Sequence, residues 1–164
     1  MTDFNMTVKA GVIDSVVEET TKYGSWRLET GGFLFGDTGT YEISGVAMAG
    51  DMGITRQPDL FEISERALDR LFTYAGDQDI WLPVQFHSHE LYSDMSLADE
   101  RYGLNAEGFV STILPSFANP PTDPSNWGWC QFEAGLWRRC ASASVVPGKA
   151  LTVVVFDEGG VRER

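Results

Sequence analysis

The segment 151–156 reads LTVVVF, and its almost wholly apolar character strongly constrains the fold of this chain. Six residues are far too few to cross a membrane. A short apolar run of this kind is typical of a β-strand that is covered on both faces, as in a sheet packed against helices. We therefore expect the stretch 150–157 to be an interior strand of a helix-covered sheet.

The composition fits one domain of this kind and excludes several classes of partner. The chain has 164 residues, 43% of them hydrophobic and 22% charged, which is enough to bury a core, so we expect residues 1–164 to form a single domain. The formal net charge of −12 argues against binding to nucleic acid or to an anionic membrane, because both need a basic surface. Cys130 and Cys140 are too few for a disulfide framework, and we expect small, half-buried core residues. The N-terminal residues show no signal-peptide pattern, which predicts a cytoplasmic protein.

The hydrophobic pattern of the whole chain mixes helices and strands. It predicts helices at 9–22, 63–75 and 96–107, strands at 28–36, 40–48, 80–89, 108–117 and 150–157, and a hairpin at 127–140 that turns near Ala134 and Gly135. Pro83 indicates that its strand lies at an edge or starts irregularly. Because helices and strands do not alternate strictly, the expected fold class is α+β, with helices packed around a mixed sheet.

The tryptophans of the chain raise a separate question. The polar, proline-rich loop 118–126 leads into Trp127 and Trp129. It is either a connector whose tryptophans are buried in the core or a flap that contacts a partner beside the functional site, and the connector is the commoner case. We expect Trp26 and Trp137 to lie in the core.

The two histidines of the chain, His87 and His89, lie two residues apart at the end of the expected strand 80–89. Side chains at i and i+2 of a strand project from the same face, so both imidazoles aim at one point. Ser96 and Asp99 are i and i+3 on the next expected helix and share a face. Two histidine nitrogens and one carboxylate oxygen are a known ligand set for catalytic zinc. The alternative is that these are ordinary polar residues, with Ser96 serving only as the helix N-cap.

A hydrolytic metal site also needs a base, and Glu29 is the candidate. It falls in the expected strand 28–36, among apolar residues where a charged group needs a reason to be. The adjacent Gly31 and Gly32 would let another backbone or a substrate approach closely. A glutamate that faces solvent at a strand end is the commoner arrangement, and these residues alone leave both interpretations open.

Together these segments resemble the JAMM/MPN+ metallopeptidases, and within that family the prokaryotic JAB-domain branch. The resemblance rests on Glu29 ahead of GGFLFG, on His-x-His at 87–89 and on Ser-x-x-Asp at 96–99, and the stretch GFVSTILPSFA at 108–118 is also similar. It extends from about residue 10 to about residue 157, although only the first three features are specific. It implies a JAB/MPN-like, cytidine-deaminase-like fold in which helices flank a mixed sheet.

The resemblance also implies a role for each site residue. His87, His89 and Asp99 would hold Zn²⁺. Glu29 would take a proton from the attacking water and return it to the leaving amine, and Ser96 would donate a hydrogen bond to the developing oxyanion. The implied activity is that of a zinc peptidase or isopeptidase that cleaves after the C-terminal glycine of a ubiquitin-like protein, in deconjugation or in precursor processing.

The chain departs from the family pattern at two points. Glu90 stands where proline usually follows the second histidine, and the loop between His89 and Ser96 is one residue shorter than usual. The shorter loop must still bring Asp99 to the metal. We expect Glu90 to be a surface residue, with a contact to substrate as the alternative.

The JAB-domain branch further implies the partners and the pathway. Its members are found beside bacterial ubiquitin-like conjugation proteins, which implies a ubiquitin-like protein or its conjugates as substrate, E1-like and E2-like proteins as partners, and a pathway such as antiphage defence. Two alternatives are a hydrolase that acts on a sulfur carrier or another small amide substrate, and a non-catalytic MPN-type scaffold that binds a partner. Nucleotide binding is poorly supported, because the chain has no phosphate-binding loop with the usual glycine and lysine spacing.

Overall fold

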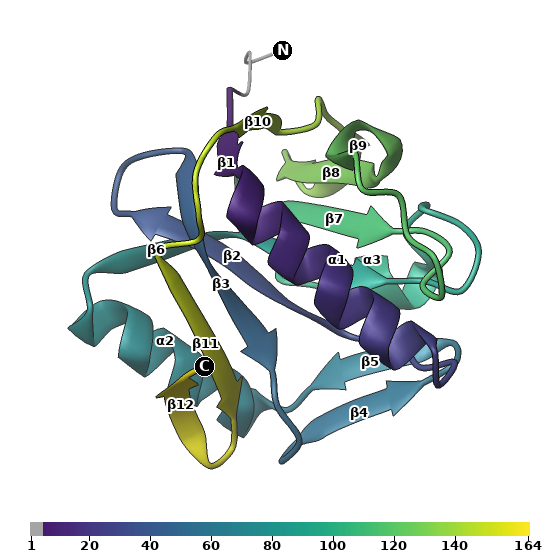
Figure 1. Cartoon of the computed structure of the whole chain (residues 1–164), viewed down its shortest axis with the longest axis horizontal. Helices are drawn as coiled ribbons and strands as arrows, with labels where there is room; N and C mark the ends of the chain where they lie inside the picture. The colour runs from purple at the N-terminus through teal and green to yellow at the C-terminus, as the bar shows by residue number, and fades with distance from the viewer. Residues whose placement is uncertain (1–4) are drawn as a thin grey trace.

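A curled, mixed β-sheet forms the centre of the structure, a computed structural model that describes residues 5–164 (Figure 1). The strands of this sheet are β1 (Thr7–Lys9), β2 (Gly31–Asp37), β3 (Glu42–Ala49), β6 (Ile80–Ser88), β7 (Val110–Leu114), β8 (Gly128–Glu133), β9 (Leu136–Arg139), β10 (Ser144–Val146), β11 (Thr152–Asp157) and β12 (Gly160–Glu163). Residues 1–4 lie outside the described range. The expectations of one domain over 1–164 and of an N-terminus without a signal peptide stay predictions.

The other elements surround this sheet. The strands β4 (Ile54–Gln57) and β5 (Leu60–Ile63) form a separate antiparallel hairpin. The helices are α1 (Ala10–Gly24), α2 (Glu65–Asp77) and α3 (Leu97–Tyr102), with a 3-10 turn at Pro124–Asn126. None of the helices within the described range is long and apolar enough to cross a membrane.

The strand order confirms the predicted α+β class with a mixed sheet. The order is β10-β1-β3-β2-β6-β7-β8-β9, and the pair β11–β12 joins the second half of β3. Antiparallel pairs such as β2–β6 occur beside parallel pairs such as β6–β7. In this strand order, β6 lies near the middle of the sheet.

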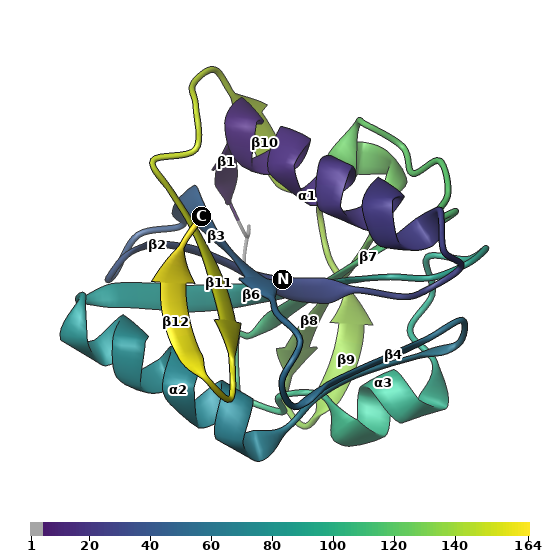
Figure 2. The same cartoon turned by 60° about the horizontal axis from the view of Figure 1, so that its bottom comes forward.

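Helices cover both faces of the sheet: α1 lies on one side, and α2 and α3 lie on the other (Figure 2). The strand β2 shows the division clearly. Leu34 is buried in the core beneath α1 with Val16, whereas Phe33 and Phe35 are buried with Leu71 of α2. Successive side chains of β2 therefore enter different cores.

The strand β11 confirms the expectation drawn from the apolar run. Val154 and Phe156 are fully buried in the core beneath α2. Val153 and Val155 pack against the core on the α1 side. Both faces of the strand are thus covered, as the near-continuous apolar sequence requires.

Pro83 occupies the irregular part of β6. The stretch before Val84 pairs with β2 alone, because pairing with β7 begins at Val84. The register with β2 also shifts between Leu34 and Gly36, opposite Pro83. A residue without a backbone N–H is tolerated at such a place, and the prediction made from Pro83 is confirmed.

The helix α3 is shorter than the expected helix 96–107. Ser96 is its N-cap, as predicted. The helix ends before Gly103, where the backbone becomes extended. This early end lets Leu104 leave the helix and pack against the core beneath α2.

The pattern of the sequence misses the hairpin β4–β5 and the short strands β1, β10 and β12. Each has only three or four residues, which is too few to show a clear alternation. The two-residue turn Pro58–Asp59 is a signal that could have identified the hairpin. The strand β2 also begins at Gly31 rather than at residue 28.

The loop 118–126 is a connector over the core. Trp127 and Trp129 are each 5% exposed and stack with ring centroids 6.2 Å apart. Their indole N–H groups donate to the carbonyls of Pro121 and Pro124, each at 2.8 Å. These contacts confirm the connector interpretation and contradict the flap.

The expectations for the other tryptophans and for the cysteines have different outcomes. Trp26 is 59% exposed, so its expected place in the core is wrong; it follows the end of α1 and meets Tyr23 edge-on at 5.6 Å. Trp137 is half-buried on the strand β9 rather than enclosed. Cys130 and Cys140 are free and half-buried, as predicted.

Gly32 and Gly76 provide a matched test of the packing. A Cβ at residue 32 would overlap the carbonyl oxygen of Ala47 on β3, whereas nothing lies within 4 Å of a Cβ at residue 76 on α2. We expect Gly32→Ala to lower the free energy of unfolding by about 1–3 kcal/mol. Gly76→Ala should raise it by about 0.5–1 kcal/mol. Urea denaturation measures both, and equal effects would contradict this packing.

Candidate metal centre

The strand β6 brings both histidines to the face of the sheet that α2 and α3 cover. His87 is 6% exposed and is paired with Gly31 of β2 and Ile113 of β7. His89 follows the strand directly, and its backbone N–H donates to the carbonyl of Leu114 at 2.9 Å. This bond continues the strand geometry past Ser88, so the two imidazoles share a face as predicted.

The N-terminus of α3 supplies the carboxylate. The backbone N–H of Asp99 donates to the hydroxyl of Ser96 at 3.1 Å, and the backbone N–H of Ser96 donates to Oδ2 of Asp99 at 2.8 Å. This reciprocal capping box holds the carboxylate in one orientation. The loop that precedes it is one residue shorter than in the resembling family, yet it brings Asp99 to both histidines.

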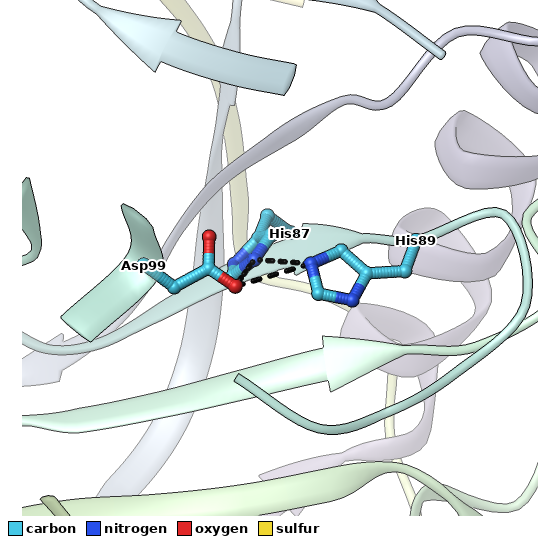
Figure 3. Close-up of side chains that lie close together, drawn as sticks. All are labelled: His87, His89 and Asp99. Atoms are coloured by element: carbon cyan, nitrogen blue, oxygen red, sulfur yellow. Dashed lines mark hydrogen bonds and ion pairs between the residues drawn. The ribbon is translucent and has the colours of Figure 1, made fainter. Parts of the chain in front are cut away.

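The three side chains converge on one point (Figure 3). Nε2 of His87 lies 3.1 Å from Nε2 of His89. Oδ2 of Asp99 lies 3.2 Å from each of these two nitrogens. The three atoms thus form a nearly equilateral triangle.

The triangle fits a tetrahedral cation. Ligand atoms about 2.0–2.1 Å from zinc at tetrahedral angles would lie about 3.3 Å apart, close to the observed separations. The donor set of two imidazole nitrogens and one carboxylate oxygen is also a set that zinc accepts. His87, His89 and Asp99 could therefore hold a metal ion and leave a fourth position open.

A backbone contact orients the imidazole of His89. Its Nδ1 lies 3.1 Å from the carbonyl oxygen of Tyr92. A carbonyl can only accept, so Nδ1 carries the proton and the lone pair of a neutral ring is on Nε2. This is the tautomer that a metal ligand needs, held by the type of outer contact that tunes metal sites.

Charge within the triad favours a cation. Burial would raise the pKa of Asp99, but hydrogen bonds from His87 and His89 outweigh it and hold the pKa well below its usual range. Burial lowers the pKa of His89, yet its contacts with Asp99 and the negative charge of Glu29 raise the pKa above its usual value. The same negative charge of Asp99 and Glu29 that favours a proton on His89 would favour a cation among the three ligand atoms.

Glu29 lies in the same pocket, ahead of β2 rather than inside it. It is 5% exposed, so it does not face solvent. Burial raises its pKa to about 7; His89 opposes this shift, while Asp99 and Asp59 add to it. A bound dication would lower this pKa again. A carboxyl group poised near neutral pH is suited to taking up and releasing a proton.

Ser96 and Glu90 lie in the same pocket. The hydroxyl of Ser96 accepts from Asp99 through a lone pair, and its own proton remains available for donation. Glu90 is partly exposed and forms an ion pair with Arg27 at 3.0 Å. The surface position expected for Glu90 fits this pair, which lies at the rim.

The triad opens into a pocket of about 730 Å³. One wall is the hairpin β4–β5, with Leu60, Phe61 and Ile63. Gly31 lets this wall approach closely, because a Cβ there would be 2.5 Å from the ring of Phe61 and would overlap the backbone of Phe86. The close approach that we expected at Gly31 and Gly32 is therefore made by other segments of this chain. The hairpin β4–β5 is the part of the site that the sequence pattern did not predict.

Comparisons with known proteins identify the fold but no family. No family model and no curated protein matches the chain. A solved structure from Desulfitobacterium hafniense is 12% identical, covers 88% of this chain and 93% of its own, and has a TM-score of 0.61. One from Salinibacter ruber is 16% identical, covers 85% and 91%, and has a TM-score of 0.55. A JAB1/MPN domain protein from Archaeoglobus fulgidus is 14% identical, covers 87% and 99%, and has a TM-score of 0.47.

The carboxylate of Asp99 allows a sharp test of metal binding. We expect Asp99→Asn to weaken zinc binding by about 100-fold or more, because the triad loses its only anionic ligand. Asp59→Asn removes a carboxylate elsewhere in the pocket and should leave zinc binding within about twofold of the wild type. Isothermal titration with zinc measures both, and equal affinities of the two variants would contradict the triad as the site.

Metal binding should also depend on pH. Zinc needs the neutral imidazole, and the contacts that raise the pKa of His89 strengthen the competition of protons with the metal. We expect zinc affinity to fall steadily as the pH is lowered from 8 to 5.5. A pH-independent affinity over this range would show that the histidines are not ligands.

Proposed function

We propose that this chain is a zinc-dependent peptidase or isopeptidase of the JAMM type, which cleaves after the C-terminal glycine of a ubiquitin-like protein. One observation is its main support: the ligand atoms of His87, His89 and Asp99 converge at metal-ligand spacing, with the buried Glu29 in the same pocket. The resemblance of the His-x-His and Ser-x-x-Asp segments to that family supports the reaction class.

The arrangement of groups suits the hydrolysis of an amide bond. A bound zinc ion would lower the pKa of water from about 15.7 towards about 7 and polarise the scissile carbonyl. Glu29 would take the proton of the attacking water and return it to the leaving amine, which otherwise departs poorly. Its burial supports this role, because removal of a carboxylate from solvent raises its pKa and makes it a stronger base.

Ser96 would serve the transition state rather than the metal. Its hydroxyl is anchored by the backbone N–H of Asp99, so the oxygen is fixed while the proton can turn. Donation of that proton to the developing oxyanion would stabilise the tetrahedral intermediate. The same residue thus caps α3 and faces the pocket.

The walls of the pocket favour an extended, flexible peptide. Within residues 5–164, β5 pairs with β4 alone, so its other edge has backbone groups available for an added strand. Phe61 and Ile63 of β5 also line the pocket. A glycine-rich C-terminal tail could lie along this edge, because it needs little width.

The charge of the pocket narrows the substrate class further. Asp59 and Glu62 line it together with the site carboxylates, and no lysine or arginine of the described residues lines it. Glu90 and Asp94 also line it, each paired at 3.0 Å with an arginine outside the pocket. A phosphate-bearing substrate would meet repulsion here, whereas a neutral or basic tail would not. E1-like and E2-like partners, a role in antiphage defence and a cytoplasmic location belong to this proposal through the family resemblance.

The carboxylate of Glu29 is the direct test of this proposal. We expect Glu29→Gln to lower kcat by about 10²–10⁴-fold, because the amide cannot accept the proton of the attacking water. Zinc binding should persist. The readout is release of a fluorescent amine joined to the C-terminal glycine of a ubiquitin-like protein, with zinc measured by elemental analysis.

Glu18→Gln is the matched control, since Glu18 is an exposed carboxylate of α1 that does not line the pocket. It should retain kcat within about threefold. Loss of zinc in Glu29→Gln would make Glu29 a structural residue instead. A zinc-loaded wild type that cleaves small amides but no ubiquitin-like fusion would favour the small-substrate alternative, and one that cleaves neither would favour the scaffold.

A further inference from the structure

We propose that Arg56, acting through Thr30 and Ser88, is a positioning residue that sets the place of Glu29 relative to the two histidines. The inference rests on the proposed function, in which Glu29 is the base. The three residues form a connected polar unit, in which Arg56 reaches Thr30 from β4 and Thr30 is hydrogen-bonded to Ser88. We call this unit the Arg56–Thr30–Ser88 link.

The first half of the link joins two backbone segments. Thr30 and Ser88 are both fully buried. The backbone N–H of Ser88 donates to the carbonyl of Thr30 at 2.9 Å, and the backbone N–H of Thr30 donates to the hydroxyl of Ser88 at 3.0 Å. The hydroxyl of Ser88 also donates to the carbonyl of Thr30 at 3.3 Å. Three hydrogen bonds therefore tie one residue to the other.

The neighbours of these two residues are the groups of the candidate site. Glu29 precedes Thr30 directly, and Ser88 lies between His87 and His89. Side chains alternate along extended backbone, so bonding on one face fixes the spacing of the groups on the other. The tie between Thr30 and Ser88 thus determines how far Glu29 stands from the two imidazoles.

Arg56 holds the Glu29 side of this tie. Its Nε donates to the hydroxyl of Thr30 at 3.1 Å. Its two terminal nitrogens donate to the carbonyls of Gly50 at 2.7 Å and Ala49 at 2.6 Å, at the end of β3. The guanidinium also lies 4.0 Å from the ring centroid of Tyr23, near the end of α1. One buried side chain therefore fastens Thr30 to two other elements.

This support matters because Glu29 lies outside a strand. Its segment leaves α1 and enters β2 only at Gly31. The backbone N–H of Glu29 donates to the carbonyl of Gln57 at 3.0 Å, and Gln57 is the residue after Arg56. Arg56 and its neighbour thus hold Glu29 and Thr30, the last two residues of the segment that joins α1 to β2.

The geometry of the guanidinium makes the link sensitive to a conservative change. A lysine keeps the positive charge but has one nitrogen, which cannot reach the hydroxyl of Thr30 and both carbonyls together. We expect Arg56→Lys to lower kcat by about 10- to 100-fold with KM unchanged within about twofold, as expected for a displaced catalytic group. Zinc stoichiometry and the absorption spectrum of the cobalt-substituted protein should not change, because the ligands stay in place.

Testing Arg56→Lys in the Glu29→Gln variant as well as in the wild type separates a positioning role from a general structural defect. In Glu29→Gln, Arg56→Lys should change the residual kcat by less than about twofold, because the group that it positions is already disabled. Equal fold-losses in both backgrounds would overturn the inference. Arg66→Lys on the exposed surface of α2 is the matched control and should have wild-type kcat.

Thr30→Val is the milder variant should Arg56→Lys fail to fold. It removes the hydroxyl that accepts from Arg56 and keeps the backbone bonds to Ser88, so it should show the same loss of kcat without loss of zinc. A crystal structure of the zinc-loaded Arg56→Lys or Thr30→Val protein gives a readout without turnover. Glu29 should be displaced relative to His87 and His89, and an unmoved Glu29 would overturn the inference even if the wild type hydrolyses no substrate and the proposed function fails.

Discussion

The pairing of β2 with β6 is the constraint on which the candidate site depends. It sets Gly31 opposite His87, and this register determines which face of the sheet the neighbouring side chains of both strands occupy. His87 and His89 then face the pocket, while Ser88 and Thr30 lie on the opposite face of the strands. A slip of one residue would exchange these faces and remove both imidazoles from the pocket. The bulge near Gly36 takes up the irregularity farther along, where no site residue is affected.

The electrostatic character of the pocket follows from groups that are difficult to bury together. Asp99 and Glu29 both approach His89, and the chain as a whole has a net charge of −12. Buried carboxylates need a counter-charge or a proton. The raised pKa of Glu29 and of His89 means that the surroundings of both groups favour a bound proton. A divalent cation between the three ligand atoms would provide it more completely and would couple metal binding to the protonation of the pocket.

Much of the site could be predicted from the sequence because it depends on local periodicity. The two-residue spacing of His87 and His89 and the capping pattern of Ser96 and Asp99 are short-range features, and both are present in the structure. The hairpin β4–β5 was missed because its strands are too short to show a pattern. The contacts of Arg56 could not be predicted, since its partners Thr30 and Gly50 come from separate segments that only the tertiary fold brings together.

The distribution of indole rings has a practical consequence for spectroscopy. Trp127 and Trp129 stack nearly parallel inside the core beneath α1, and their hydrogen bonds fix them there. Their coupled near-ultraviolet signal will report the integrity of the whole domain. Of the tryptophans in the described residues, Trp137 lines the pocket, so its fluorescence is suited to reporting a ligand bound there. The chain thus contains separate intrinsic optical reporters of unfolding and of occupancy.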